Sequence, residues 1–201
     1  MTPGARRAFL RLGPAALLAG CALPAREPEL TASVIDQLPA DLPHAARTAR
    51  TLLVLAPRAQ AAYDTRRMAY SLRPHHLAYY GRNEWASTPP QMLQPLLVRT
   101  LDATGHFQAV LVPPQAGGAT HSLQVDVLQL LQDFDAQPPV LRLVLHAQLA
   151  DAAQRVLASR EFALQQVMTE AAPAGGVRAA NEAMAQALRA LALFVLEGAH
   201  H

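Results

Sequence analysis

The sequence has a single cysteine, Cys21, and after it no apolar run long enough to cross a membrane. One cysteine excludes an internal disulfide. Every later apolar run is interrupted by polar residues before it reaches the roughly 20 residues that a transmembrane helix requires. About 180 residues follow Cys21, with a high apolar fraction and few aromatic residues. This length predicts one domain with enough chain for a sizeable core.

Motifs of the common enzyme classes are also missing. The chain has no nucleophile elbow, no glycine-rich phosphate-binding loop and, once Cys21 is modified, no free thiol nucleophile. His75 and His76 are adjacent, so on a strand they point to opposite faces and cannot jointly bind a metal. Asp126, Asp133 and Asp135 could form a calcium site, although turn-forming acids between strands explain them more simply. We therefore expect a protein that is not an enzyme and binds no metal or cofactor.

The residues before Cys21 have the layout of a secretory signal peptide. Arg6, Arg7 and Arg11 flank the start of a short apolar segment, residues 12–19, that is too short for a permanent transmembrane helix. Three of the 17 basic residues precede Cys21 and all 15 acids follow it, so the remaining chain has a net charge of −1. The sequence pI of 9.1 thus reflects the removed segment, which leaves no support for a nucleic-acid partner.

The end of this segment, Leu18-Ala19-Gly20-Cys21, is similar to the lipobox of bacterial lipoproteins. In that motif the cysteine thiol receives a diacylglyceryl group, and cleavage then leaves the cysteine as the first residue. We expect lipidation of Cys21 with acyl chains such as palmitate, since two or three chains anchor a protein stably. The alternatives are an ordinary signal peptide with an unrelated cysteine, or a buried structural cysteine. Ala22 stands where Asp would favour the inner membrane, so we expect the periplasmic face of the outer membrane.

The composition divides the rest of the chain into a linker and a domain. Residues 22–48 contain four prolines and scattered charges, a pattern typical of a tether between a membrane and a folded domain. The expected division is a signal peptide at 1–20, lipidated Cys21 and its tether at 21–48, the domain at 49–197 and a tail at 198–201.

Short apolar runs predict four strands and one helix in the first half of the domain. The strands cover residues 51–56, 66–71, 75–80 and 107–112, the second and third forming a hairpin around Arg73-Pro74. Thr88 is expected to cap a helix whose leucines recur at helical spacing and which ends at Gly105. Pro95 lies inside this pattern and should bend the helix or delay its start.

The second half alternates apolar and polar residues with a period of two. This pattern predicts an antiparallel meander of strands over 123–128, 140–147 and 155–165, with turns at 133–139 and 151–154. A long alanine-rich helix with one apolar face follows Gly175-Gly176. The order of elements predicts an α+β domain, in which two main helices pack on one face of a largely antiparallel sheet.

Five of the ten aromatic residues lie within 23 positions, between Tyr63 and Trp85. Either these rings fill one end of the core, or they form a partner-binding surface, since tyrosine, tryptophan and arginine are good anchors at interfaces. Both can hold for different rings, because adjacent Tyr79 and Tyr80 on a strand must face opposite ways. The candidate partner-binding residues are Tyr63, Arg67, Tyr70, Tyr79, Tyr80, Asn83 and Trp85.

This stretch resembles the ABC-type transport auxiliary lipoproteins. The matching segments are Tyr63-Asp64-Thr65, Arg67-Met68-Ala69-Tyr70, Tyr79-Tyr80, Asn83-Glu84-Trp85-Ala86, Pro89-Pro90-Gln91-Met92-Leu93 and, in the last helix, Val177-Arg178-Ala179-Ala180-Asn181. The resemblance runs from Cys21 to about Leu196, and Pro95 departs from it locally.

The resemblance implies a non-catalytic component of an MCE-type lipid transport system. There an inner-membrane permease and its ATPase work with an MCE-domain protein that crosses the periplasm. The family includes the lipoprotein of the paraquat-inducible Pqi system, which forms a ring at the outer membrane and receives the tip of the MCE protein. Its fold resembles the N-terminal domain of TolB. The implied partners are therefore an MCE-domain protein and further copies of the chain.

Two other interpretations belong to different classes. One is a lipoprotein that reaches through the peptidoglycan to activate a cell-wall synthase, although such proteins usually have a longer tether than residues 22–48. The other is an envelope hydrolase, which needs a nucleophile–base pair that the sequence does not show.

Overall fold

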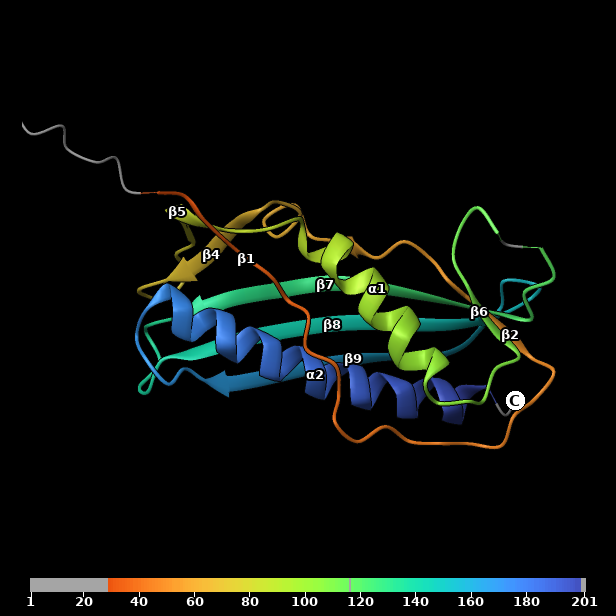
Figure 1. The fold of residues 1–201 in the computed structure, drawn as a ribbon. Helices are drawn as coiled ribbons and strands as arrows, with labels where there is room; N and C mark the ends of the chain where they lie inside the picture. The colour runs from red at the N-terminus through yellow and green to blue at the C-terminus, as the bar shows by residue number, and fades with distance from the viewer. Residues whose placement is uncertain (1–28, 116, 200–201) are drawn as a thin grey trace, which may run out of the picture.

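The computed structural model describes residues 29–115 and 117–199. The predicted signal peptide, Cys21 and residues 200–201 of the predicted tail lie outside this part of the chain. Within it, one mixed sheet of nine strands carries two helices, α1 (Pro89–Asp102) and α2 (Pro173–Gly198), on one face (Figure 1). The α+β fold predicted from the order of elements is confirmed.

Three long antiparallel strands form the main part of the sheet. β7 (His121–Asp133), β8 (Val140–Asp151) and β9 (Val156–Val167) pair along almost their whole lengths. They are the meander that the period-two pattern predicted. A bulge between Val127 and Gln129 adds one residue to β7, so its buried positions change there from odd to even numbers.

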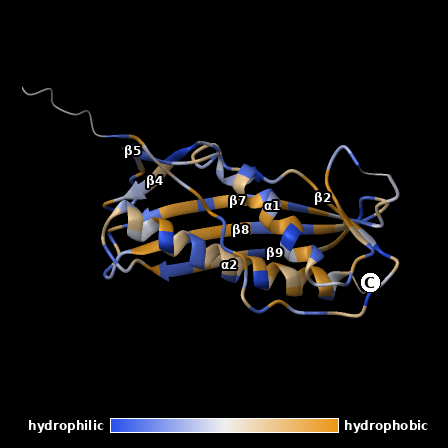
Figure 2. Ribbon diagram, in the orientation of Figure 1, coloured by the Kyte–Doolittle hydropathy of each residue, from blue (hydrophilic) through white to orange (hydrophobic). Residues whose placement is uncertain are grey.

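The side of the sheet that faces the helices is apolar. In β8 the leucines from Leu141 to Leu149 are buried toward α2, whereas Arg142 and His146 on the other side are partly exposed. Figure 2 shows these hydrophobic strands behind the helices. The buried face of α2 includes Ala180, Ala183, Met184, Ala187, Leu188 and Leu191. α2 is long and apolar enough to span a membrane. However, 67% of its most apolar 18-residue stretch is buried in the domain, as expected for a core helix.

The remaining strands are short, and most run parallel to their neighbours. β2 (Thr51–Val54) lies between β6 (Ala109–Leu111) and β7 and is parallel to both. β3 (Arg58–Ala59) and β4 (Arg67–Ser71) are also parallel to β7, while β4 and β5 (Ala78–Trp85) form the predicted antiparallel hairpin. The long ladders are therefore antiparallel, as predicted, and the short ones make the sheet mixed. Apolar runs indicate strands but not their direction.

The chain before residue 49 is part of the fold, which corrects the predicted tether and the predicted start of the domain. β1 (Thr31–Ser33) pairs in parallel with the edge strand β5. Ile35 is buried in the core, and Leu38 and Leu42 pack against it. The folded unit thus begins at about Thr31.

Residues 34–48, which we call the strap, cross the outer side of α2 (Figure 1). The backbone N–H groups of Asp36 and Gln37 donate to Asn181 Oδ1 at 2.9 and 3.1 Å. Further along the helix, Arg189 Nε donates to the carbonyl oxygen of Asp41 at 3.1 Å. Prolines and charges are typical of a linker, but here α2 side chains supply the hydrogen bonds that an irregular backbone needs.

The first helix is continuous through its proline. α1 begins at Pro89, directly after the predicted cap Thr88, so Pro95 does not delay its start. It ends at Asp102, and Gly105 follows with a φ of 69°, a conformation that glycine adopts without strain.

The second helix begins earlier than predicted, because the glycine pair lies inside it. α2 starts at Pro173, so Gly175 and Gly176 are in its first turn. A Cβ at Gly175 would overlap the Glu170 backbone, and one at Gly176 would overlap the Gln132 side chain. Gly176 therefore permits α2 to approach β7 closely, and Gly175 leaves room for the Glu170 backbone before the helix.

Gly176→Ala should lower the free energy of unfolding by about 1–3 kcal/mol, because the added methyl group must displace Gln132. Gly81→Ala is the matched control: no atom lies within 4 Å of a Cβ at that position. Its effect should stay within about 0.5 kcal/mol. Urea unfolding followed by circular dichroism measures both, and equal stabilities of the two variants would contradict this account of α2 packing.

Candidate functional site

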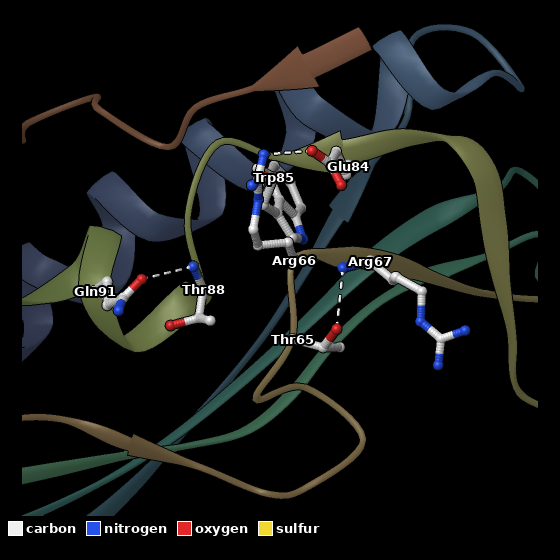
Figure 3. Close-up of polar contacts among 7 residues, drawn as sticks. All are labelled: Thr65, Arg66, Arg67, Glu84, Trp85, Thr88 and Gln91. Atoms are coloured by element: carbon white, nitrogen blue, oxygen red, sulfur yellow. Dashed lines mark hydrogen bonds and ion pairs between the residues drawn. The ribbon is translucent and has the colours of Figure 1, made fainter. Parts of the chain in front are cut away.

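The candidate partner-binding residues lie at one corner of the domain, made by a loop at 60–66, the β4–β5 hairpin and the start of α1 (Figure 3). Hydrogen bonds join the 60–66 loop to β5. The Trp85 N–H donates to the Arg66 carbonyl oxygen at 2.7 Å, and Arg66 Nε donates to the Trp85 carbonyl oxygen at 3.1 Å. Arg66 also forms an ion pair with Glu84. These contacts hold the loop against the end of β5.

The edge strand and α1 are joined to the same corner. The Ala86 N–H donates to the Ser33 carbonyl oxygen at 2.7 Å, which continues the β1–β5 pairing toward the helix. At the start of α1 the Thr88 N–H donates to Gln91 Oε1 at 3.2 Å (Figure 3). The polar residues of the motif thus connect β1, β5 and α1.

Tyr63 and Trp85 belong to the core. Their side chains are only 8% and 3% exposed, and Met68 beside them is buried as well. Burial also raises the pKa of the Tyr63 hydroxyl. Both rings therefore pack inside the domain, and their part in binding a partner stays a prediction.

Arg67 and Tyr79 form an outward-facing pair on the side of the sheet without helices. The Arg67 guanidinium carbon lies 4.1 Å from the centroid of the Tyr79 ring. The Tyr79 hydroxyl donates to the Ala62 carbonyl oxygen at 3.0 Å, which fixes the ring at its far end. Asn83 is half-buried where β5 meets β1. The Arg67–Tyr79 pair therefore presents a cation and an aromatic ring in a fixed arrangement.

Tyr70 and Tyr80 lie on the helix side of the hairpin, with ring centroids 4.5 Å apart. The Tyr80 hydroxyl donates to Gln132 Oε1 at 2.9 Å, beside the start of α2. Burial, and secondarily the neighbouring Tyr70, raise the pKa of Tyr80 to about 12. The prediction that Tyr79 and Tyr80 face opposite ways agrees with these contacts.

An apolar groove of about 300 Å³ lies next to these two rings. Its lining consists of Tyr70, Leu72, Tyr80, Phe134 and residues 171–173. The Phe134 ring stands edge-on to Tyr70 at 6.3 Å, and the Phe134 N–H donates to the Ser71 carbonyl oxygen at 2.9 Å. The turn after β7 is thereby attached to the end of β4.

The acids and histidines singled out in the sequence do not form a metal site. His75 and His76 lie in the turn before β5, not on a strand as expected, and His75 has a φ of 58°. Asp133 Oδ2 accepts from Arg142 Nε at 2.6 Å, and its Oδ1 accepts from the Asp135 N–H at 3.0 Å. Among residues 29–115 and 117–199, no group of three or more His, Cys, Asp or Glu residues could hold a metal ion.

Two polar sites were not anticipated from the sequence. One is a cavity of about 510 Å³ on the side of the sheet without helices, lined in part by Tyr63, His76, Asp133 and Arg142. Its residues come from separate segments. The sequence singled out the histidines and Asp133 and Asp135, but no pattern indicated that they line one cavity.

The other site joins Thr120 and His121 at the start of β7. Thr120 Oγ1 lies 2.9 Å from both the Thr51 carbonyl oxygen and His121 Nδ1. Because the hydroxyl proton is donated to the Thr51 carbonyl, the imidazole does not activate this oxygen as a nucleophile. Burial lowers the pKa of His121, which favours the neutral ring. The contact links β2 to β7 and is structural.

Trp85→Ala should lower the free energy of unfolding by about 3–5 kcal/mol, because it removes a large buried ring. Arg67→Ala should cost at most about 1 kcal/mol, since an exposed cation–π contact contributes little. Guanidinium unfolding monitored by circular dichroism separates the two classes of motif residue. A Trp85→Ala variant as stable as the parent would show that the ring does not support the core.

The sequence matches the family model described as ABC-type transport auxiliary lipoprotein component over residues 34–192. The match begins inside the strap. A crystal structure from Xanthomonas campestris, assigned to family DUF330, shares 25% identity with a TM-score of 0.73 and covers 85% of this chain and 96% of its own. A crystal structure of an uncharacterized protein, 20% identical with a TM-score of 0.64, covers 82% of this chain and 99% of its own and shares the fold. No curated protein matches the sequence. The chain belongs to the family of ABC-type transport auxiliary lipoprotein components.

Proposed function

We propose that the chain is a non-catalytic lipoprotein of an MCE-type ABC lipid transport system. It is anchored at the periplasmic face of the outer membrane through Cys21, and it docks the MCE-domain protein that crosses the periplasm. The observation that carries the proposal is the family match over residues 34–192 together with the lipobox that ends at Cys21. The family supplies the association with a transporter, and the lipobox supplies the membrane anchor.

The chemistry of the described residues supports a scaffold. The Thr120 hydroxyl is committed to the Thr51 carbonyl, and Asp133 is committed to Arg142 and the Asp135 backbone. These polar groups stabilise the sheet and its turns. What the corner of the domain offers outward is a ring, a cation and an amide, which are groups that bind other proteins.

The Arg67–Tyr79 pair is the proposed anchor for the MCE-domain protein. Arginine and tyrosine are enriched among the residues that dominate binding energy at interfaces. The Tyr79 hydroxyl bond to Ala62 holds the ring before a partner arrives, so little side-chain entropy is lost on binding. Asn83 extends this surface for docking. Tyr70 and Tyr80, on the opposite side of the hairpin, form a second surface that we propose for contact between copies in a ring.

The folded strap argues against activation of a cell-wall synthase. The nine residues 22–30 connect Cys21 to Thr31, where the fold begins. At about 3.3–3.6 Å per residue, they reach at most about 35 Å. A regulator that must pass through the peptidoglycan needs a longer connection, whereas a docking protein held close to its membrane does not.

Cys21→Ser should move the protein from the membrane to the soluble periplasmic fraction, because the thiol that carries the lipid is lost. Ala22→Asp should keep it membrane-bound but shift it to the inner membrane. Cell fractionation with a sucrose gradient measures both variants against the parent chain. Cys21→Ser protein that still sediments with membranes would refute lipidation at Cys21, and parent protein in the inner membrane would refute the proposed address.

Arg67→Ala should weaken binding to the MCE-domain protein of the same system by about tenfold or more, as expected for a hot-spot arginine. Arg160→Ala is the matched control, because its guanidinium carbon also lies over a ring, that of Phe194, at 5.2 Å on another part of the surface. Biolayer interferometry with the lipid-free periplasmic domains gives both affinities.

The two parts of the proposal fail in different ways. If the parent chain does not bind the MCE-domain protein, docking itself is wrong. If Arg67→Ala and Arg160→Ala bind equally well, docking stands and the assigned surface is wrong. Light scattering of the same samples reports whether copies of the chain associate.

A further inference from the structure

Exposed apolar side chains gather at one end of the sheet. Leu72 and Leu77 are 59% and 39% exposed, and they flank the short loop that joins β4 to β5. We call this loop, residues 72–77, the hairpin tip. Its neighbours are the turn that starts at Phe134 and the segment that leads into α2, which line the apolar groove with Leu72. Isolated exposed leucines are common, but two on one short loop beside an apolar groove are not.

The two leucines face different sides of the hairpin. Leu72 lines the apolar groove on the helix side, and Leu77 lines the cavity on the side without helices. Polar residues stand between them, since Arg73 and His75 are exposed in the same loop. A protein partner that covers one side of the sheet would bury one leucine and leave the other in water. A surface that lies across this end of the sheet would contact both leucines.

The anchored end of the chain lies at the same end of the molecule. Figure 1 shows the chain entering the fold at the end of the molecule where β4 ends and α2 begins. Thr31 pairs there with Asn83 on β5, and the preceding Leu30 is exposed. Eight residues lie between Cys21 and Leu30, which limits their distance to about 30 Å. β8, with 12 residues, runs about 40 Å from this end of the sheet to the opposite end, where the turn at Ala153 lies.

Two of the acids at this end are paired with arginines. Asp133 pairs with Arg142, and Glu170 pairs with Arg178 at 2.6 Å, while Glu29 and Asp135 are exposed. Leucines with adjacent basic residues, here Leu72 and Arg73, are typical of segments that lie in the interface of a bilayer.

We propose that the hairpin tip rests in the lipid interface of the membrane that holds Cys21, with Leu72 and Leu77 inserted at headgroup depth. The proposal relies on the lipidation included in the proposed function. It makes a lipid surface, rather than a second copy or the MCE-domain protein, the occupant of the hairpin tip. The long strands β7–β9 then stand away from the membrane, and the turn at Ala153 faces the periplasm.

The test places a fluorophore at either end of the lipidated chain. His75→Cys labels the hairpin tip and Ala153→Cys labels the opposite turn, and both positions are exposed. Lipidated Cys21 is a thioether and does not react with the label. In vesicles of phosphatidylethanolamine and phosphatidylglycerol that contain a lipid with a nitroxide in its acyl chain, quenching should be several-fold stronger at position 75 than at position 153.

A second variant tests the leucines themselves. Leu72→Asp combined with Leu77→Asp should abolish the excess quenching at position 75, although the chain stays attached through its lipid. Val156→Asp is the matched control, because Val156 is 57% exposed and lies at the other end of the sheet. It should leave the quenching unchanged.

Equal quenching at positions 75 and 153 in vesicle-bound protein would overturn this proposal and leave the proposed function intact. So would a Leu72→Asp, Leu77→Asp variant that keeps its quenching, or one whose self-association is lost instead, since a second copy would then cover the tip. Protein that stays out of the vesicles, or that takes the label at Cys21, would refute lipidation and with it both proposals.

Discussion

The close packing of α2 against β7, β8 and β9 is the contact on which the rest of the domain depends. It is possible because small residues recur along the buried face of the helix from its first turn to its last, between larger ones such as Met184 and Leu188. Glycines begin it at Gly175-Gly176, alanines continue it, and at Gly198 a Cβ would lie 2.8 Å from the Leu149 side chain. On its outer side the same helix supplies Asn181 and Arg189, to which the strap is attached. α2 thus has the sheet on one side and the start of the domain on the other.

The corner around the aromatic motif shows how one sequence motif can serve both fold and surface. Trp85 and Tyr63 fill the core, and Arg66 ties the loop to β5 through its side chain. The next residue, Arg67, points outward and stacks on Tyr79. The family motif is therefore a feature of the fold at least as much as of a binding surface. Its exposed side chains, such as that of Arg67, are the ones placed to contact a partner.

Much of the fold follows from local patterns in the sequence. The meander of β7–β9 was predicted because alternation over a dozen residues leaves little choice of strand face, and Thr88 was predicted because it precedes a helix with a proline start. The strap was missed, because its prolines and charges match a linker and its hydrogen-bond partners are distant in the sequence. Some lie about 145 residues away on α2, and others at Thr104 and His106 after α1. The direction of the short strands depends on pairing with distant β7, and the place of Gly176 inside α2 depends on its close contact with Gln132. At the candidate site, the alternation of side chains along a strand predicted that Tyr79 and Tyr80 face opposite sides. The burial of Tyr63 and Trp85 depends on contacts with residues far away in the sequence, so no short stretch of sequence predicts it.

The strap also has a consequence for how the protein is made. Asp36 and Asp41 find their partners at Asn181 and Arg189, which are 145 and 148 residues later in the chain. Although β1 can pair with β5 earlier, residues 36–41 keep these hydrogen bonds unmade until the middle of α2 is available. Contacts of such long sequence separation form slowly, because a large loop must close first. A chain truncated before Asn181 would therefore lose the attachment of the strap to α2 along with the helix itself.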